Sequence, residues 1–192
     1  MAAVFSSREV AEFAKVPVRT VDKAVEEQIL VRGPRSRKRA GLLPLHAIPY
    51  AALVKRLPVI LERAEKLRLA RSLARKSPRK MTSEPVEIAP ALIVDVSRLM
   101  DASLAERAAR YARTRDRTIV EDPEILGGTP VIKGTRLSVH AVRGRIDGGE
   151  TYEALLEDFP DLDREALEAA VLYARTHPLV GRPAKRRWRE VA

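Results

Sequence analysis

The spacing of apolar residues at the start of the chain predicts a short helix that begins after Ser6. Ser6 and Glu9 stand three positions apart, which is the spacing of a capping box, where the two side chains satisfy backbone N–H groups at a helix start. Val10 and Phe13 then fall on one face of the helix, as inward residues do. Pro17 ends the segment, because proline lacks an N–H and restricts the residue before it.

A second helix is expected over residues 18–28, where Val21, Val25 and Ile29 recur every four positions and form one apolar stripe. Two short helices joined by a tight turn fit helix-turn-helix geometry, in which the second helix enters the major groove of DNA. The side chains near its start that point away from the stripe, and are predicted to read bases, are Arg19, Thr20 and Lys23.

A basic segment follows and predicts a two-stranded wing. Residues 32–39 read RGPRSRKR, and apolar pairs flank them at Leu30-Val31 and Leu42-Leu43. The tip of such a wing lies against DNA phosphates and adds affinity that depends on salt but not on base sequence. The residues predicted to make these phosphate contacts are Arg32, Arg35, Arg37, Lys38 and Arg39.

Helices over about residues 45–57 and 59–76 complete a small N-terminal domain, residues 1–76. Its pattern resembles the winged helix-turn-helix of MerR-type regulators, through SSREVAEFAKVPVRTVDKAVEEQIL, the wing and LHAIPYAALVKRL. It departs from that family at Pro17, where a serine cap is more common, and at Glu26-Glu27, whose charges we expect to point away from DNA. The resemblance implies a DNA-binding domain.

Residues 77–117 are expected to connect this domain to another. Residues 77–90 are rich in Ser, Pro and Lys and predict a linker, residues 91–99 are a β-prone run, and a helix follows over about 104–115. Helix-turn-helix proteins commonly bind as dimers, so this segment is a candidate for dimerisation, with the short strand pairing across two copies. A plain spacer is the alternative.

The stretch GGTPVIKGTR at residues 127–136 has the composition of a phosphate-binding loop but a different order. A Walker-type loop has four residues between its glycines and a lysine directly after the second one. Here Lys133 precedes Gly134, and five residues separate Gly128 from Gly134. The stretch is therefore predicted to have a structural role and not to bind a nucleotide.

A β-hairpin fits this part of the chain better, with strands at 118–120 and 130–133 and glycines in the turn. Three helices follow, with N-caps at Ser138, Thr151 and Asp163. The fold class predicted for the whole chain is mainly α with short β hairpins. Its parts are a winged helix-turn-helix, a C-terminal domain over residues 118–180 with a hairpin and three helix-turn-helix-like helices, and a tail.

Charge is distributed unevenly along the chain, whose net charge is +10. Residues 1–80 hold 19 Lys and Arg against 7 Asp and Glu, a net charge of +12, whereas residues 118–180 hold 6 against 12, a net charge of −6. The tail, residues 181–192, is +4. The basic segment at residues 1–80, here called the basic front, is expected to bind a polyanion. The acidic segment at residues 118–180 is expected to bind a protein rather than DNA.

Residues 121–174 resemble the bacterial family known as domain of unknown function four-three-three. The motif D-P-x-I-x-x-G-x-P-x-I-x-G-T-R is present from Asp122 to Arg136, and a glycine stop and Phe159-Pro160-Asp161-Leu162 follow. Members of that family are similar to VapB-type antitoxins, which pair with a small PIN-like ribonuclease toxin. Together with the N-terminal domain, the resemblance implies an antitoxin that inhibits such a toxin and represses its own operon.

Inhibition of a PIN-like nuclease, whose metal pocket is lined by carboxylates, calls for arginine, because guanidinium pairs bidentately with carboxylate. One candidate is Arg136, for which an internal bond to Asp122 or Glu124 is the alternative. The other is the tail, for which a frayed solvated terminus is the alternative. Its candidate toxin-binding residues are Arg182, Lys185, Arg186, Arg187, Trp188 and Arg189.

Several classes of site are not supported by the sequence. The chain has no cysteine, and its three histidines, His46, His140 and His177, have no metal-ligand spacing, so we expect no metal and no cofactor. No nucleophile–base constellation is present, and we expect no enzymatic activity. No signal peptide or membrane-spanning run is evident, and the expected location is the cytoplasm.

The first hypothesis is therefore a homodimeric, operator-binding antitoxin of a type II toxin–antitoxin pair. The alternative is a stand-alone MerR-like transcriptional regulator whose C-terminal domain senses a ligand or another protein. A nucleoid-type structural binder, which would need only the basic front, is a third class.

Overall fold

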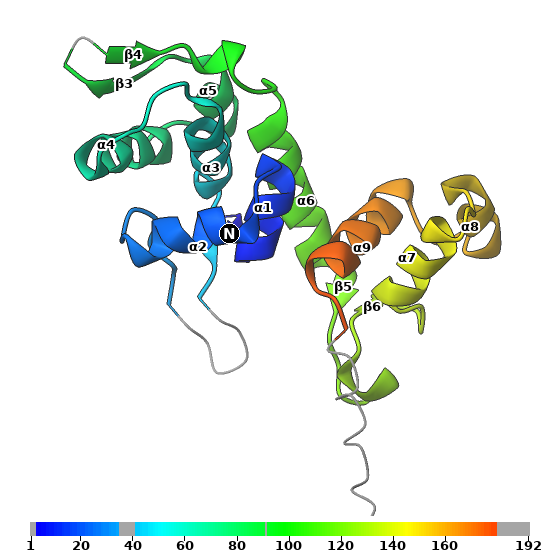
Figure 1. The fold of residues 1–192 in the computed structure, drawn as a ribbon. Helices are drawn as coiled ribbons and strands as arrows, with labels where there is room; N and C mark the ends of the chain where they lie inside the picture. The colour runs from blue at the N-terminus through cyan, green and yellow to red at the C-terminus, as the bar shows by residue number, and fades with distance from the viewer. Residues whose placement is uncertain (1–2, 35–40, 91, 180–192) are drawn as a thin grey trace, which may run out of the picture. The chain divides into compact units, whose positions relative to one another are not determined.

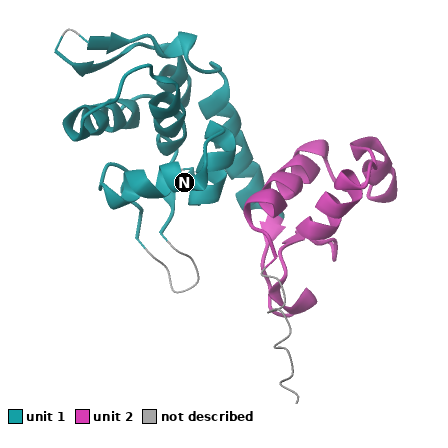
Figure 2. Cartoon of the chain, viewed as in Figure 1, with its two compact units in different colours: residues 1–118 teal, residues 119–192 magenta. Residues whose placement is uncertain are grey.

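The structure is a computed structural model that describes residues 3–34, 41–90 and 92–179. The chain forms two compact units, residues 1–118 and residues 119–192 (Figure 2). The described residues are mostly helical, and their strands form three antiparallel pairs (Figure 1). The predicted fold class, mainly α with short β pairs, is confirmed at this level.

Unit 1 begins with two helices, α1 (Ser7–Ala14) and α2 (Val18–Glu26). The capping box is present as predicted: Ser6 N–H donates to Glu9 Oε2 at 2.7 Å, and Glu9 N–H donates to Ser6 Oγ at 3.2 Å. Lys15 ends α1 in the left-handed conformation with φ at 55°, and its neighbour Val16 is buried. The turn is therefore short, and the two predicted helices are confirmed.

Strand β1 (Val4–Phe5) pairs with β2 (Leu43–Pro44), and α3 (Ala47–Arg56) follows. At the base of the expected hairpin after α2, Gly33 N–H donates to Leu42 O at 2.8 Å. Beyond that bond the returning arm pairs with β1 instead of with the residues that leave α2. The core residues gathered by this arrangement include Phe5, Leu30, Leu43, Ile48 and Leu53.

The next helix, α4 (Arg63–Ala74), starts later than the apolar pattern suggests. Glu62 and Glu65 form a second capping box, with Glu62 N–H donating to Glu65 Oε2 at 2.8 Å, and this fixes the start of the helix. Ile60, which the apolar pattern placed in the helix, is instead 99% exposed.

The segment predicted to be a linker, residues 77–90, contains α5 (Pro78–Ser83) and β3 (Val86–Ala89), and β3 packs against α4. Ser77-Pro78 is a helix start, with proline at the first position where its missing N–H costs nothing. Strand β4 (Leu92–Val94) pairs with β3 of the same chain, and the 3₁₀ turn η1 (Val96–Arg98) follows. The strand that we expected to bridge two copies thus has its partner within one chain.

Helix α6 (Leu104–Thr118) closes unit 1 and carries one side of a buried ion pair. Arg115 Nη1 donates to Glu9 Oε1 at 2.7 Å, and only 6% of Arg115 and 1% of Glu9 are exposed. Tyr111 Oη donates to the same carboxylate oxygen at 2.7 Å, and Arg115 Nη2 donates to Val4 O at 3.0 Å. The last helix of the unit is thereby fastened to the capping box of the first.

Burial alone would raise the pKa of Glu9, since a carboxylate is poorly solvated inside a protein. The Arg115 charge and the hydrogen bonds from Ser6, Arg115 and Tyr111 outweigh burial, so the pKa lies below its ordinary value. Glu9 is therefore ionised in the fold, and its carboxylate joins α1 to α6.

Unit 2 starts with a hairpin of β5 (Ile119–Val120) and β6 (Val131–Ile132), with the 3₁₀ turn η2 (Leu126–Gly128) between them. Three helices follow, α7 (Val139–Asp147), α8 (Tyr152–Asp158) and α9 (Arg164–Thr176). Their N-caps are Ser138, Thr151 and Asp163, as predicted. The core of the unit includes Ile132, Val142, Leu155, Leu167 and Val171.

Within residues 3–34, 41–90 and 92–179, no helix combines the length and the apolar character that a membrane crossing requires.

Candidate functional site

Helix α2 presents the side chains predicted to read bases on its solvent side. Arg19 and Lys23 are exposed and Thr20 is half-buried, whereas Val21 and Ala24 are buried against the rest of unit 1. Arg19 makes no ion pair or hydrogen bond with a described residue. Lys23 has one loose contact, 3.8 Å from Glu27. The first two turns of α2 therefore offer a polar, cationic edge.

Arg32, predicted to contact phosphate, is engaged inside the protein. Its Nη2 donates to Ser7 Oγ at 2.6 Å and lies 3.4 Å from Asp22 Oδ1, and its Nη1 donates to Gly41 O at 3.0 Å. These bonds tie both arms of the basic hairpin to α1 and α2. The other wing residues predicted to meet phosphate, Arg35, Arg37, Lys38 and Arg39, lie outside the described residues.

One of the two glutamates at the end of α2 is engaged by α4. Glu27 Oε2 accepts from Lys66 Nζ at 3.0 Å, and its carbonyl oxygen accepts from Arg63 Nε at 3.3 Å, so Glu27 is directed to the start of α4. Glu26 is exposed. The like-charge conflict with DNA that the sequence raised is removed for Glu27 by this pairing.

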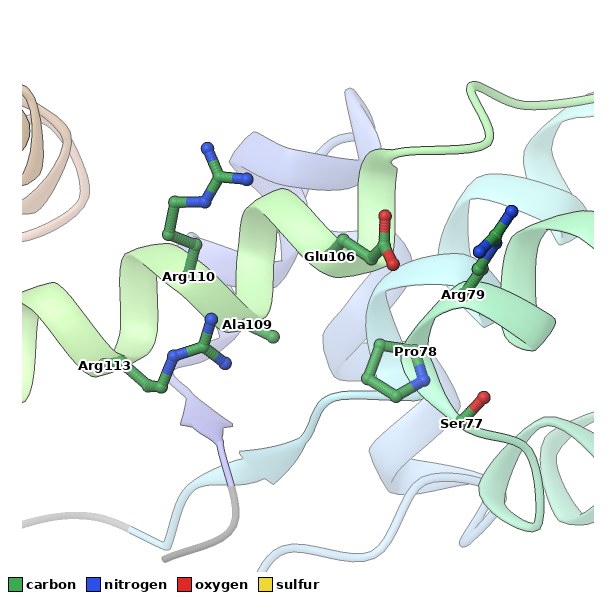
Figure 3. A pocket seen from close by; sticks show the side chains of 7 residues that line it. All are labelled: Ser77, Pro78, Arg79, Glu106, Ala109, Arg110 and Arg113. Atoms are coloured by element: carbon green, nitrogen blue, oxygen red, sulfur yellow. The ribbon is translucent and has the colours of Figure 1, made fainter.

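Two hollows on unit 1 were not anticipated. One, of about 470 Å³, lies between α5 and α6 and is lined by Ser77, Pro78, Arg79, Glu106, Ala109, Arg110 and Arg113 (Figure 3). The other, of about 450 Å³, lies along α4 and is lined by Arg68, Arg71, Ser72, Arg75 and Lys76. The arginines at positions 68, 71 and 75 share one helix face by spacing alone, which is the signal that could have found them.

In unit 2, four described arginines form ion pairs within the unit. Arg143, Arg145, Arg164 and Arg175 each pair with one or two carboxylates of the same unit. Arg145 bonds both Glu150 and Asp158 and lies over the Phe159 ring, and Arg164 is held in the same way by Glu153, Glu168 and the Tyr152 ring. Sequence reasoning did not identify this role, because the three partners gather around Arg145 only when α7 and α8 fold together.

Two cations of unit 2, Lys133 and Arg136, are exposed and have no ion pair among the described residues. The alternative bond from Arg136 to Asp122 or Glu124 is not formed: Asp122 Oδ1 accepts from the backbone N–H of Glu124 at 3.0 Å. The turn that carries Arg136 is held by Thr135, whose Oγ1 donates to Ile132 O at 2.8 Å and accepts from Leu137 N–H at 3.0 Å. The tail residues predicted to bind a toxin, from Arg182 to Arg189, lie outside the described residues.

The histidines have local packing roles. Burial lowers the pKa of His46, and burial together with Arg143 and His177 lowers the pKa of His140. The His177 ring stacks on Tyr173 with centroids 4.0 Å apart. No group of three or more His, Asp and Glu side chains within residues 3–34, 41–90 and 92–179 is placed to hold a metal ion.

Comparison with known proteins gives a match for unit 2. Residues 119–174 match the model of the family described as "Protein of unknown function (DUF433)", which confirms the resemblance stated for that segment. The uncharacterized protein y4eO of Sinorhizobium fredii (strain NBRC 101917 / NGR234) is 38% identical over 91 residues, which are 47% of this chain and 40% of that protein. The match thus spans less than half of that relative's length.

Among solved structures, the X-ray crystal structure of Rv2018 from Mycobacterium tuberculosis is similar at 17% sequence identity with a TM-score of 0.37, over 89% of this chain and 98% of that one. The MerR-type and VapB-type resemblances remain predictions.

Proposed function

We propose that the chain is a DNA-binding antitoxin, in which α2 reads operator DNA and unit 2 binds and silences a PIN-like ribonuclease. The observation that carries the DNA-binding part is the exposed edge of α2. Arg19, near its start, and Lys23 lie on the side opposite the buried stripe, and Thr20 lies half-buried at the edge of that side; recognition helices place their base contacts on such an exposed side. Arg32 fixes the base of a basic hairpin beside them.

The DNA-binding part is tested with the chain's own upstream DNA in a fluorescence anisotropy titration of the full chain. Arg19→Ala with Lys23→Ala is expected to weaken binding to this duplex by about tenfold or more, because base contacts are worth about 1–3 kcal/mol each. The matched control is Arg98→Ala with Arg107→Ala, which removes the same charge from two exposed residues that pair with Asp95 and Asp101. Equal losses in both variants, or no preference for the upstream duplex over a scrambled one, would refute recognition by α2.

The partner-binding part is supported by Arg136, an exposed cation of unit 2 that, like Lys133, has no ion pair among the described residues. A carboxylate-lined metal pocket attracts such a guanidinium, which stays charged at any working pH. The test is nuclease-treated capture of the full chain from its native cells, followed by assay of any small nuclease that co-purifies.

Arg136→Ala is expected to release nuclease activity, whereas Arg98→Ala is not. If truncation after Val180 releases it and Arg136→Ala does not, the tail supplies the blocking group. If no nuclease co-purifies while the upstream DNA is still bound, the antitoxin proposal fails and a stand-alone regulator, the alternative function, takes its place.

A further inference from the structure

Six exposed arginines line two hollows on the surface of unit 1. They come from α4, α5 and α6 and are here called the α4–α6 face: Arg68, Arg71, Arg75, Arg79, Arg110 and Arg113. None of them makes an ion pair or hydrogen bond with a described residue. The two hollows described above lie on this face, and the consecutive residues Lys76 and Ser77 line one hollow each.

Arg8, Arg19 and Arg56 of unit 1 also have no ion pair or hydrogen bond with a described residue, but the α4–α6 face gathers six such arginines. Elsewhere in unit 1, Arg98, Arg107 and Arg115 are all bonded to carboxylates. Among the residues that line the two hollows, Glu106 is the only acid. Like charges three and four positions apart on a helix repel by about a few tenths of a kcal/mol. Repulsion among Arg68, Arg71 and Arg75 therefore destabilises α4, and no carboxylate among the described residues pairs with them to offset it. A bound polyanion would offset this repulsion.

The shape of the face favours an extended anion over a small one. Arg68, Arg71 and Arg75 lie on the side of α4 opposite the buried Leu69 and Leu73, and they span about 10 Å of helix. Figure 3 shows the side chains of Arg79 and Arg110 directed outward from α5 and α6, so they line an open surface. No buried polar group on the face would select a single small ligand.

The position of the face favours nucleic acid as the occupant. The start of α4 contacts the end of α2, because Lys66 Nζ lies 3.0 Å from Glu27 Oε2, so the face belongs to the same unit as the helix proposed to read DNA. We propose that the α4–α6 face binds the phosphodiester backbone of nucleic acid, without regard to base sequence and independently of the contacts made by α2.

The test uses the full chain in which Arg19→Ala and Lys23→Ala have silenced α2, and a labelled duplex of scrambled sequence as the probe. Binding is measured by anisotropy across a series of sodium chloride concentrations. Adding Arg68→Ala, Arg71→Ala and Arg75→Ala is expected to reduce the slope of log K against log salt by about 2–3, since each phosphate contact contributes roughly 0.9.

The matched control adds Arg98→Ala, Arg107→Ala and Arg164→Ala, three exposed and ion-paired arginines, and is expected to change the slope by less than about 1. An equal reduction in the control would mean that only net charge matters, and an unchanged slope in the face variant would mean that the face meets no phosphate. Either result overturns the proposal. Because the scrambled duplex is bound without α2, this outcome is separate from that of the upstream-DNA test.

Discussion

The two units handle their arginines in opposite ways. Unit 1 leaves Arg19 and the α4–α6 face unpaired at the surface and uses a carboxylate for Arg115 in its interior. Unit 2 pairs four of its described arginines with its own carboxylates and leaves Lys133 and Arg136 free of ion pairs within the described residues. The difference shows that net charge alone is a poor guide to a partner, and that the cations left without carboxylates are the informative ones.

Unit 2 has more carboxylates than cations, but many of these carboxylates are ion-paired within the unit. Five of its described carboxylates are engaged by arginines of the same unit: Asp147, Glu150, Glu153, Asp158 and Glu168. Surface ion pairs of this kind contribute little to stability, but they cancel charge locally. Among the described residues of unit 2, Arg136 at the hairpin exit and Lys133 are the cations that have no ion pair.

The largest expected effect is on stability, and it distinguishes a buried arginine of unit 1 from an exposed one. Arg115→Ala is expected to lower the free energy of unfolding by about 3–5 kcal/mol, because it leaves the Glu9 carboxylate buried without its counter-charge. Urea denaturation followed by circular dichroism measures this. Arg113→Ala, two residues earlier on the exposed side of α6, is the matched control and is expected to change stability by less than about 0.5 kcal/mol. Equal effects of the two substitutions would show that the buried pair is not what holds α6 to α1.

A smaller effect is expected from Glu9→Gln, and it depends on pH. The substitution keeps the shape but removes the charge, and is expected to cost about 2 kcal/mol at pH 7 from weakened hydrogen bonds to Arg115. Because the folded pKa of Glu9 is depressed, its contribution is present above the ordinary value of 4.5 and is lost as pH falls through the folded pKa. The gap in unfolding free energy between wild type and Glu9→Gln should therefore shrink below about pH 4.5. A gap that is constant with pH would contradict an ionised Glu9.

The smallest effect concerns the turn that presents Arg136 in unit 2. Gly134 has a φ of 81°, so Gly134→Ala is expected to destabilise unit 2 by about 1–2 kcal/mol. Gly144→Ala, in the interior of α7 with no atom within 4 Å of the added methyl group, is expected to stabilise it by about 0.5–1 kcal/mol. Hydrogen exchange resolved over residues 119–179 measures both. If the two substitutions have the same sign, the positive φ does not govern this turn.

Local signals predicted much of the fold. The capping residues Ser6, Ser138, Thr151 and Asp163 each fixed a helix start within a few positions, because a cap acts on neighbouring N–H groups. The segment at residues 77–90 was misjudged as a linker because β3 is stabilised by β4 and α4, contacts that no local pattern reveals. The structure of residues 77–90 thus depends on contacts with residues outside that segment.

For the candidate sites too, features set by a local sequence pattern were predicted, and features set by tertiary contacts were not. The exposure of Arg19 and Lys23 followed from the apolar stripe of α2, which is a local pattern. The internal bonds of Arg32 did not, because Ser7 and Gly41 reach it only after the chain folds. The Glu9–Arg115 pair spans 106 residues and has no sequence signature.

The most direct test of the central claim is a measurement of both binding activities on the same two variants of the full chain. Arg19→Ala with Lys23→Ala, and separately Arg136→Ala, are each assayed for binding to the upstream duplex and for inhibition of the co-purified nuclease. The account predicts that the first variant loses DNA binding and keeps inhibition, and that the second keeps DNA binding and loses inhibition. If either variant loses both activities while remaining folded, or if neither loses one, the division of functions between the two units is contradicted.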